Sequence, residues 1–177
     1  MSACLFFFEC LGSLLGVGYI LLISKKLRSG WILGSLSCGV FAAICFQNQW
    51  LAQGIIQTIN ALFGVYAFLS WGKSKVEVHS EPVYFWGLIC LAPMLMGGSF
   101  LVLPAIPWSQ HLDHCALGLS LVGTWLTLRV IRENWYFWLV INALTTLTAF
   151  YNGLYFFAAL SLLYFSLSIY GLFQWKK

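Results

Sequence analysis

The sequence has 177 residues, of which 61% are hydrophobic and only 8% are charged, with a net charge of +4 and a mean hydropathy of +0.87. Soluble domains typically carry about 25% charged residues, so a chain this apolar cannot cover its surface with polar groups. The composition therefore excludes a soluble globular domain and indicates a protein whose solvent is lipid.

Apolar windows along the chain predict seven helices that span a membrane. A spanning helix needs about 20 mainly apolar residues, and the windows lie at residues 4–23, 31–47, 51–71, 84–104, 112–128, 134–150 and 154–173. Each window must be helical in lipid, because no other open segment satisfies its own backbone polar groups. The expected fold class is therefore an all-α polytopic membrane protein with seven transmembrane helices.

The basic residues indicate how these helices are oriented. With seven spans, all nine Lys and Arg residues fall on the same side of the membrane, namely Lys25, Lys26, Arg28, Lys73, Lys75, Arg129, Arg132, Lys176 and Lys177. The positive-inside rule makes this side cytoplasmic, with the N-terminus outside and the C-terminus inside. The positive charge is thus a topology signal and implies no nucleic-acid partner.

An internal repeat relates the two ends of the chain. A shift of 104 residues (135 minus 31) aligns without a gap Glu9 with Asp113, Lys25 with Arg129, Arg28 with Arg132, Trp31 with Trp135, Asn48 with Asn152, Tyr66 with Tyr170 and Trp71 with Trp175. We therefore expect a three-helix repeat over 1–75, a linker helix over 76–108 and a second three-helix repeat over 109–177. A single linker span makes the repeats parallel, and this 3-1-3 arrangement is typical of transporters with midplane substrate sites.

Polar residues within two predicted spans are the main candidates for substrate binding. In the span 51–71, Gln57 and Asn60 lie on one helical face, and in the span 134–150, Trp135, Trp138 and Asn142 do the same. Intramembrane polar residues are rare and usually functional, and flat aromatic rings beside amides suit a planar, polar heterocycle. The alternatives are that Trp135 is an interfacial tryptophan and that the amides bridge helices.

The acidic and metal-binding residue types give weaker signals. Glu9 and Asp113 occupy matching places near the outer ends of two spans, and we treat them as candidate gates or proton-coupling groups. His111 and His114 flank Asp113, but an HxxH pair without further ligands does not predict a metal site. Since the sequence also contains no GxSxG, phosphate-binding glycine loop or acidic cluster, we expect no catalytic residues, no cofactor and no enzymatic activity.

The C-terminal part of the sequence resembles a known family. The stretch from Arg132 to Asn142 reads RENWYFWLVIN and is similar to the ENWxxW signature of the PnuC family of bacterial vitamin transporters. Three other parts of the sequence also resemble that family. The end of the chain resembles its last helix, Gln57 with the Val65–Trp71 ending resembles its third helix, and Asp113 resembles its fifth helix. Tyr66-Ala67-Phe68 departs from the Tyr-Gly-Trp that is frequent in the family.

This resemblance implies a SWEET-like 3-1-3 fold and facilitated diffusion of nicotinamide riboside across the bacterial inner membrane. It further implies that Trp135, Trp138 and Asn142 line the substrate site together with Gln57. The resemblance also implies functional coupling to a cytosolic kinase, which traps the vitamin by phosphorylation. A homo-oligomer is compatible with the sequence. The alternatives are uptake of thiamine or riboflavin by the same fold, and a non-transporting membrane subunit that binds a ligand or partner.

Overall fold

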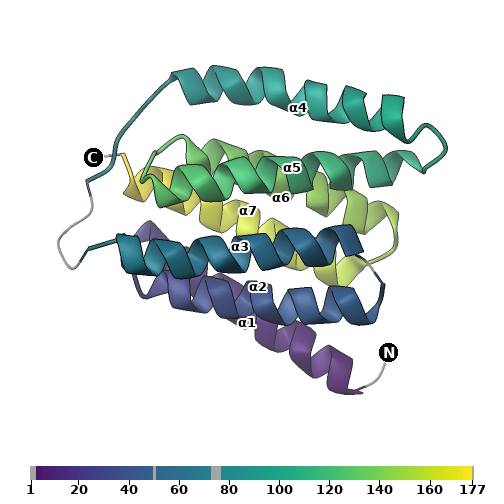
Figure 1. Ribbon diagram of the computed structural model, residues 1–177, viewed down its shortest axis with the longest axis horizontal. Helices are drawn as coiled ribbons and strands as arrows, with labels where there is room; N and C mark the ends of the chain where they lie inside the picture. The colour runs from purple at the N-terminus through teal and green to yellow at the C-terminus, as the bar shows by residue number, and fades with distance from the viewer. Residues whose placement is uncertain (1–2, 50, 73–76, 177) are drawn as a thin grey trace. The chain divides into compact units, whose positions relative to one another are not determined.

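The computed structural model describes residues 3–49, 51–72 and 77–176, without the side chains of residues 3–5, 52 and 156. These residues form seven α-helices (Figure 1): α1 (Ala3–Ser24), α2 (Gly30–Gln47), α3 (Leu51–Ser70), α4 (Val83–Val102), α5 (Trp108–Leu128), α6 (Asn134–Tyr151) and α7 (Tyr155–Gln174). The prediction of an all-α, seven-helix chain is confirmed. Lys73, Lys75, Lys177 and the predicted boundary at 75/76 lie outside the described residues.

Helix α5 begins four residues before the predicted start at 112. It starts directly after Pro107, and Ser109 and His111 in its first turn, which look like a loop in the sequence, are buried. His111 is 1% exposed, its Nδ1 atom hydrogen-bonds to Ser99 Oγ at 2.7 Å, and its ring stacks on Phe100. Helix α4 therefore covers polar residues that would otherwise face solvent or lipid.

The apolar surface of the helices indicates where lipid contacts the chain. Leu69 and Leu101 are 74% and 86% exposed, whereas Ser24 and Thr127 are each 1% exposed. Four helices, Phe6–Ser24, Gly30–Gln47, Val83–Val102 and Phe157–Gln174, are long and apolar enough to cross a membrane by length and composition. The remaining helices α3, α5 and α6 contain more polar residues, including most of the predicted binding residues.

The chain divides into two compact units, Met1–Glu77 and Val78–Lys177. In unit 1, α2 packs against both α1 and α3. Polar side chains join the helices, since Ser37 Oγ donates to the carbonyl of Gly12 on α1 at 2.7 Å and Ser35 Oγ donates to that of Ala61 on α3 at 3.1 Å. Gly64 permits this close approach, because a Cβ atom there would collide with Ser35.

In unit 2, α6 packs against both α5 and α7, and α4 packs on α5. The apolar core between these helices consists of Leu88, Cys115, Ala116, Leu119, Leu126, Ile131, Phe137 and Ile141. The segment before α4 also contacts the α5–α6 turn, where His79 forms a β-bridge with Ile131. The buried Glu133 carboxylate accepts hydrogen bonds from Ser80 Oγ at 2.7 Å and Glu81 N at 3.0 Å. These contacts therefore hold the segment before α4 against the α5–α6 turn of unit 2.

The helix ends of the two units share an unusual geometry at positions 104 residues apart. Lys26 after α1 and Val130 after α5 have φ of 59° and 58°, and each occupies the left-handed position of a Schellman cap. The diagnostic hydrogen bonds also match, with Leu27 N to Leu22 O at 2.9 Å and Ile131 N to Leu126 O at 3.0 Å. After α2 and α6, Gln49 and Gly153 likewise have φ of 61° and 74°.

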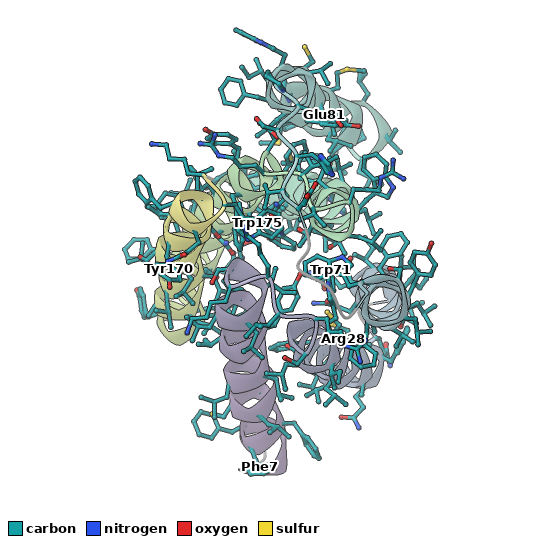
Figure 2. The ribbon with its side chains drawn as sticks, turned by 90° about the vertical axis from the view of Figure 1, so that its left-hand side faces the viewer. Phe7, Arg28, Trp71, Glu81, Tyr170 and Trp175 are labelled. Carbon is teal, nitrogen blue, oxygen red and sulfur yellow. The ribbon has the colours of Figure 1, made fainter. Side chains whose placement is uncertain are left out.

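A tryptophan pair in each unit follows the same spacing. Trp31 meets Trp71 edge-to-face with centroids 5.3 Å apart and an interplanar angle of 86°, and Trp135 meets Trp175 at 5.3 Å and 84°. All four rings are at most 4% exposed. Figure 2 labels the second ring of each pair, Trp71 in unit 1 and Trp175 in unit 2. The same edge-to-face tryptophan contact is therefore present in both units.

Candidate binding site

The aromatic and amide residues of α6 provide the candidate site of unit 2. Trp138 is partly buried, and its indole Nε1 donates to Thr127 Oγ1 on α5 at 3.2 Å. The Thr127 hydroxyl in turn donates to the carbonyl of Gly123 at 2.7 Å. Because this hydroxyl uses its proton on Gly123, its lone pairs are available to the indole N–H, and the ring is held by its edge while part of its surface stays exposed.

Asn142 lies on the same side of α6, one helical turn beyond Trp138. Its side chain is 7% exposed, and Nδ2 donates to Ser168 Oγ on α7 at 3.2 Å. Ser168 is itself 1% exposed and donates to the carbonyl of Tyr164 at 2.8 Å. The side-chain amide of Asn142 is therefore held by a hydrogen bond to α7 and not by one to its own helix.

Trp135 is placed differently from Trp138. Its ring is 2% exposed, packs edge-to-face on Trp175 and lies so close to Gly171 that a Cβ atom there would collide with it. Its indole nitrogen is buried without a hydrogen-bond partner in the described structure, as is that of Trp31 at the matching place in unit 1. The structure thus brings Trp135 into the packing of α6 on α7, whereas Trp138 contacts α5.

The candidate residues of unit 1 lie on α3. Gln57 and Asn60 are both half-buried, and their spacing places them on one face of the helix. The neighbouring Thr58 is exposed, and its hydroxyl donates to the carbonyl of Gly54 within the same helix at 2.8 Å. The amide residues therefore occupy the more buried side of this turn of α3.

The two candidate gates are both half-buried. Glu9 is on α1, where its backbone carbonyl accepts a hydrogen bond from Ser13 at 2.7 Å. Asp113 is on α5, and its carboxylate lies beside the Thr148 hydroxyl of α6 and the His114 ring. Within the residues that the structure describes, no three His, Cys, Asp or Glu side chains form a group that could hold a metal ion.

Sequence reasoning did not identify the partners that hold Trp138 and Asn142. Thr127 and Ser168 are ordinary polar residues on neighbouring helices, and neither belongs to a motif. One signal does point to the helices that supply these partners, since helices joined by a short turn pack side by side as an antiparallel pair. Trp138 and Thr127 lie on either side of the α5–α6 turn, and Asn142 and Ser168 on either side of the α6–α7 turn.

Comparison with known proteins identifies the family. The family model described as nicotinamide mononucleotide transporter matches residues 7–177. This chain belongs to that family.

Individual relatives agree with the family assignment. The nicotinamide riboside transporters PnuC of Escherichia coli (strain K12) and Shigella flexneri are each 24% identical to the chain, over 93% of this chain and 81% of their own length. A solved structure described as the vitamin B3 transporter PnuC matches with a TM-score of 0.73, at 19% identity, over 96% of this chain and 80% of that one. The chain is therefore a multi-pass membrane transporter with the PnuC fold, and not an enzyme.

Proposed function

We propose that the chain carries nicotinamide riboside across the bacterial inner membrane by facilitated diffusion, and that a cytosolic kinase traps the substrate by phosphorylation. The names of the curated relatives support the riboside, whereas the family description names the mononucleotide. The two compounds share the nicotinamide ring and the ribose and differ by one phosphate group. The charge of the binding region of the protein therefore indicates which of the two compounds is bound.

The distribution of basic residues favours the riboside. All nine Lys and Arg residues lie outside the seven described helices, in turns, linkers or the C-terminal end. A phosphate group is usually bound through Arg or Lys side chains, which the described helices do not contain. The pyridinium ring of nicotinamide riboside is cationic and attracts aromatic faces.

The arrangement of Trp138 and Asn142 supports the proposal most strongly. A partly exposed indole, held by Thr127, lies one turn from an amide held by Ser168, so ring stacking and hydrogen bonding are available on one helix. We propose that these two residues bind the substrate together with Trp135 and with Gln57 and Asn60 of unit 1. Glu9 and Asp113 are the proposed gates.

We further propose that transport uses two parallel three-helix repeats, 1–75 and 109–177, joined by a linker helix within 76–108. The matched Schellman caps and the matched tryptophan pairs support a duplication, because unrelated helices have no reason to repeat both features at one spacing. The basic loops support an external N-terminus and a cytoplasmic C-terminus. A rigid repeat that moves against the other is a common mechanism of alternating access.

Uptake into proteoliposomes that contain the purified chain alone tests the proposed function. We expect saturable, gradient-driven accumulation of labelled nicotinamide riboside up to equilibrium, without a proton or sodium gradient. Excess nicotinamide riboside should compete, whereas nicotinamide mononucleotide, thiamine and riboflavin should not. Preferential uptake of thiamine or riboflavin would replace the substrate, and no flux of any vitamin through folded protein would contradict the transport function.

Two substitutions test the proposed site. We expect Trp138→Ala and Asn142→Ala to lose most of the uptake while the protein still inserts in the membrane. Trp86→Ala on α4 and Asn152→Ala after α6 are matched controls, since both residues are exposed, and they should retain uptake. Normal uptake by Trp138→Ala and Asn142→Ala would remove these residues from the proposed site.

A further inference from the structure

The hydrogen bond between Asn142 and Ser168 connects α6 to α7 inside unit 2. Both side chains are buried, at 7% and 1% exposure, and the bond from Asn142 Nδ2 to Ser168 Oγ is 3.2 Å long. The Ser168 hydroxyl also donates to the backbone carbonyl of Tyr164 at 2.8 Å. Asn142, Ser168 and Tyr164 thus form a short chain of hydrogen bonds that ends on the backbone of α7.

The single hydroxyl proton determines the direction of this chain. A serine hydroxyl has one proton to donate and two lone pairs to accept with. Because the proton is used on the Tyr164 carbonyl, Ser168 can only accept a hydrogen bond from Asn142. The amide nitrogen of Asn142 must therefore face α7, and the carbonyl oxygen Oδ1 lies at the other edge of the planar amide group.

Unit 1 does not have this pair, although it shares the helix caps and the tryptophan contact. The positions 104 residues before Asn142 and Ser168 are Cys38 and Gly64, and α2 is instead joined to its neighbours through Ser35 and Ser37. Packing of the shared three-helix architecture thus does not need the amide–hydroxyl pair. The pair in unit 2 is therefore available for a role in addition to joining α6 to α7.

We propose that Ser168 is a positioning residue that fixes the orientation of the Asn142 amide, so that Oδ1 is presented to a hydrogen-bond donor of the substrate. This inference rests on the proposed function. The ligand class is a heteroaromatic compound with an N–H donor such as a primary carboxamide. An analogue with a carboxylate at the same place has only acceptors and meets the fixed Oδ1 unfavourably.

The test compares the affinities of two ligands for the purified full chain by titration calorimetry. The ligands are nicotinamide riboside, which has a carboxamide, and nicotinic acid riboside, which has a carboxylate. In the wild type we expect the carboxamide to bind at least tenfold more tightly. In Ser168→Ala the amide can rotate, so we expect the ratio of the two dissociation constants to fall about tenfold, mainly through weaker carboxamide binding.

Ser166→Ala is the matched control, because the Ser166 hydroxyl also donates to a carbonyl of its own helix, that of Leu162 at 3.0 Å, but it is exposed. The ratio should stay at the wild-type value in this variant. If Ser168→Ala fails to fold, Ser168→Thr keeps the hydroxyl and should retain the ratio, whereas Ser168→Gly has the residue of unit 1 and should lose it.

The outcomes separate this inference from the proposed function. A wild-type chain that binds neither riboside overturns the proposed function and this inference with it. A wild-type chain that prefers the carboxamide, with the same ratio in Ser168→Ala, overturns the inference alone. Equal weakening of both ligands in Ser168→Ala also overturns it, because a purely structural role lowers both affinities together.

Discussion

Thr127 is the residue that determines how Trp138 is presented. The Trp138 indole N–H donates to its hydroxyl, which is 1% exposed on α5, so the ring cannot rotate away without leaving a polar group unpaired. Thr127→Val keeps the shape of the side chain and removes the acceptor. Loss of one such hydrogen bond costs about 1 kcal/mol, so we expect nicotinamide riboside to bind about fivefold more weakly, as measured by titration calorimetry.

A second threonine provides the control for this prediction. Thr145 on α6 is half-buried and donates to the carbonyl of Ile141 at 2.9 Å, as Thr127 does to that of Gly123. Thr145→Val should leave the affinity within twofold of the wild type. Equal affinities of Thr127→Val and the wild type would show that the indole hydrogen bond does not influence binding.

The candidate site was only partly predictable at the level of single residues. Helical spacing predicts Trp138 and Asn142 on one face of α6, and in the structure their hydrogen-bond partners lie on α5 and on α7, respectively. The same spacing grouped Trp135 with them, although its ring is packed between Gly171 and Trp175. Periodicity gives the direction of a side chain from its own helix, but burial depends on the neighbouring helix, which spacing does not describe.

Among the structural elements, the segment before α4 depends on one buried carboxylate. Glu133 is 4% exposed and accepts hydrogen bonds from Ser80 and from the backbone of Glu81. Glu133→Ala leaves both donors without this partner, and hydrogen bonds to a charged group contribute about 1.5–3 kcal/mol each. We expect a lower midpoint of thermal unfolding and much faster hydrogen exchange at the Glu81 amide.

Glu77 is the matched control for Glu133, because it precedes the same segment and is exposed. Glu77→Ala should leave the unfolding midpoint and the exchange rate at Glu81 unchanged. Slow exchange at Glu81 in Glu133→Ala would mean that the β-bridge between His79 and Ile131 is sufficient to hold the segment.

The turns after α2 and α6 allow a reciprocal test of the helix caps. Gln49 and Gly153 occupy matching left-handed positions with φ of 61° and 74°, and only glycine adopts this conformation without a cost of about 1–2 kcal/mol. Gln49→Gly should therefore stabilise the chain by about 1 kcal/mol, and Gly153→Gln should destabilise it by a similar amount. Thermal unfolding in detergent measures both effects, and shifts of the same sign would contradict the shared cap geometry.

Helix existence was readable from the sequence, whereas some helix ends and connections were not. Seven apolar windows predicted seven helices, because a spanning helix needs a long apolar stretch whatever its neighbours are. The start of α5 lies before the predicted one, since His111 looks like part of a loop until its hydrogen bond to Ser99 on α4 is seen. The contact of the α4 entry with the α5–α6 turn also joins residues more than 50 positions apart, and no local pattern describes it.

For the whole molecule, the basic residues predict the orientation in the membrane. Ser29 lies in the α1–α2 turn beside Lys25, Lys26 and Arg28, and Asn152 lies in the α6–α7 turn, which has no basic residue. Both residues are exposed, so single cysteines at these places report the two sides of the membrane. In a background with the native cysteines replaced by alanine, a membrane-impermeant maleimide applied to intact cells should label Asn152→Cys and not Ser29→Cys.

The same pair of variants shows which result would change the topology. After the membrane is permeabilised, both variants should react, which confirms that each thiol is accessible. Labelling of Ser29→Cys in intact cells would place the basic turns outside and invert the chain, against the positive-inside rule. Labelling of both variants in intact cells would require an even number of spans between residues 29 and 152, whereas the helices α2 to α6 are five in the described structure. Agreement with the expected pattern would place the N-terminus outside. It would also place the two termini on opposite sides of the membrane, which is the arrangement that two parallel three-helix repeats with one linker helix require.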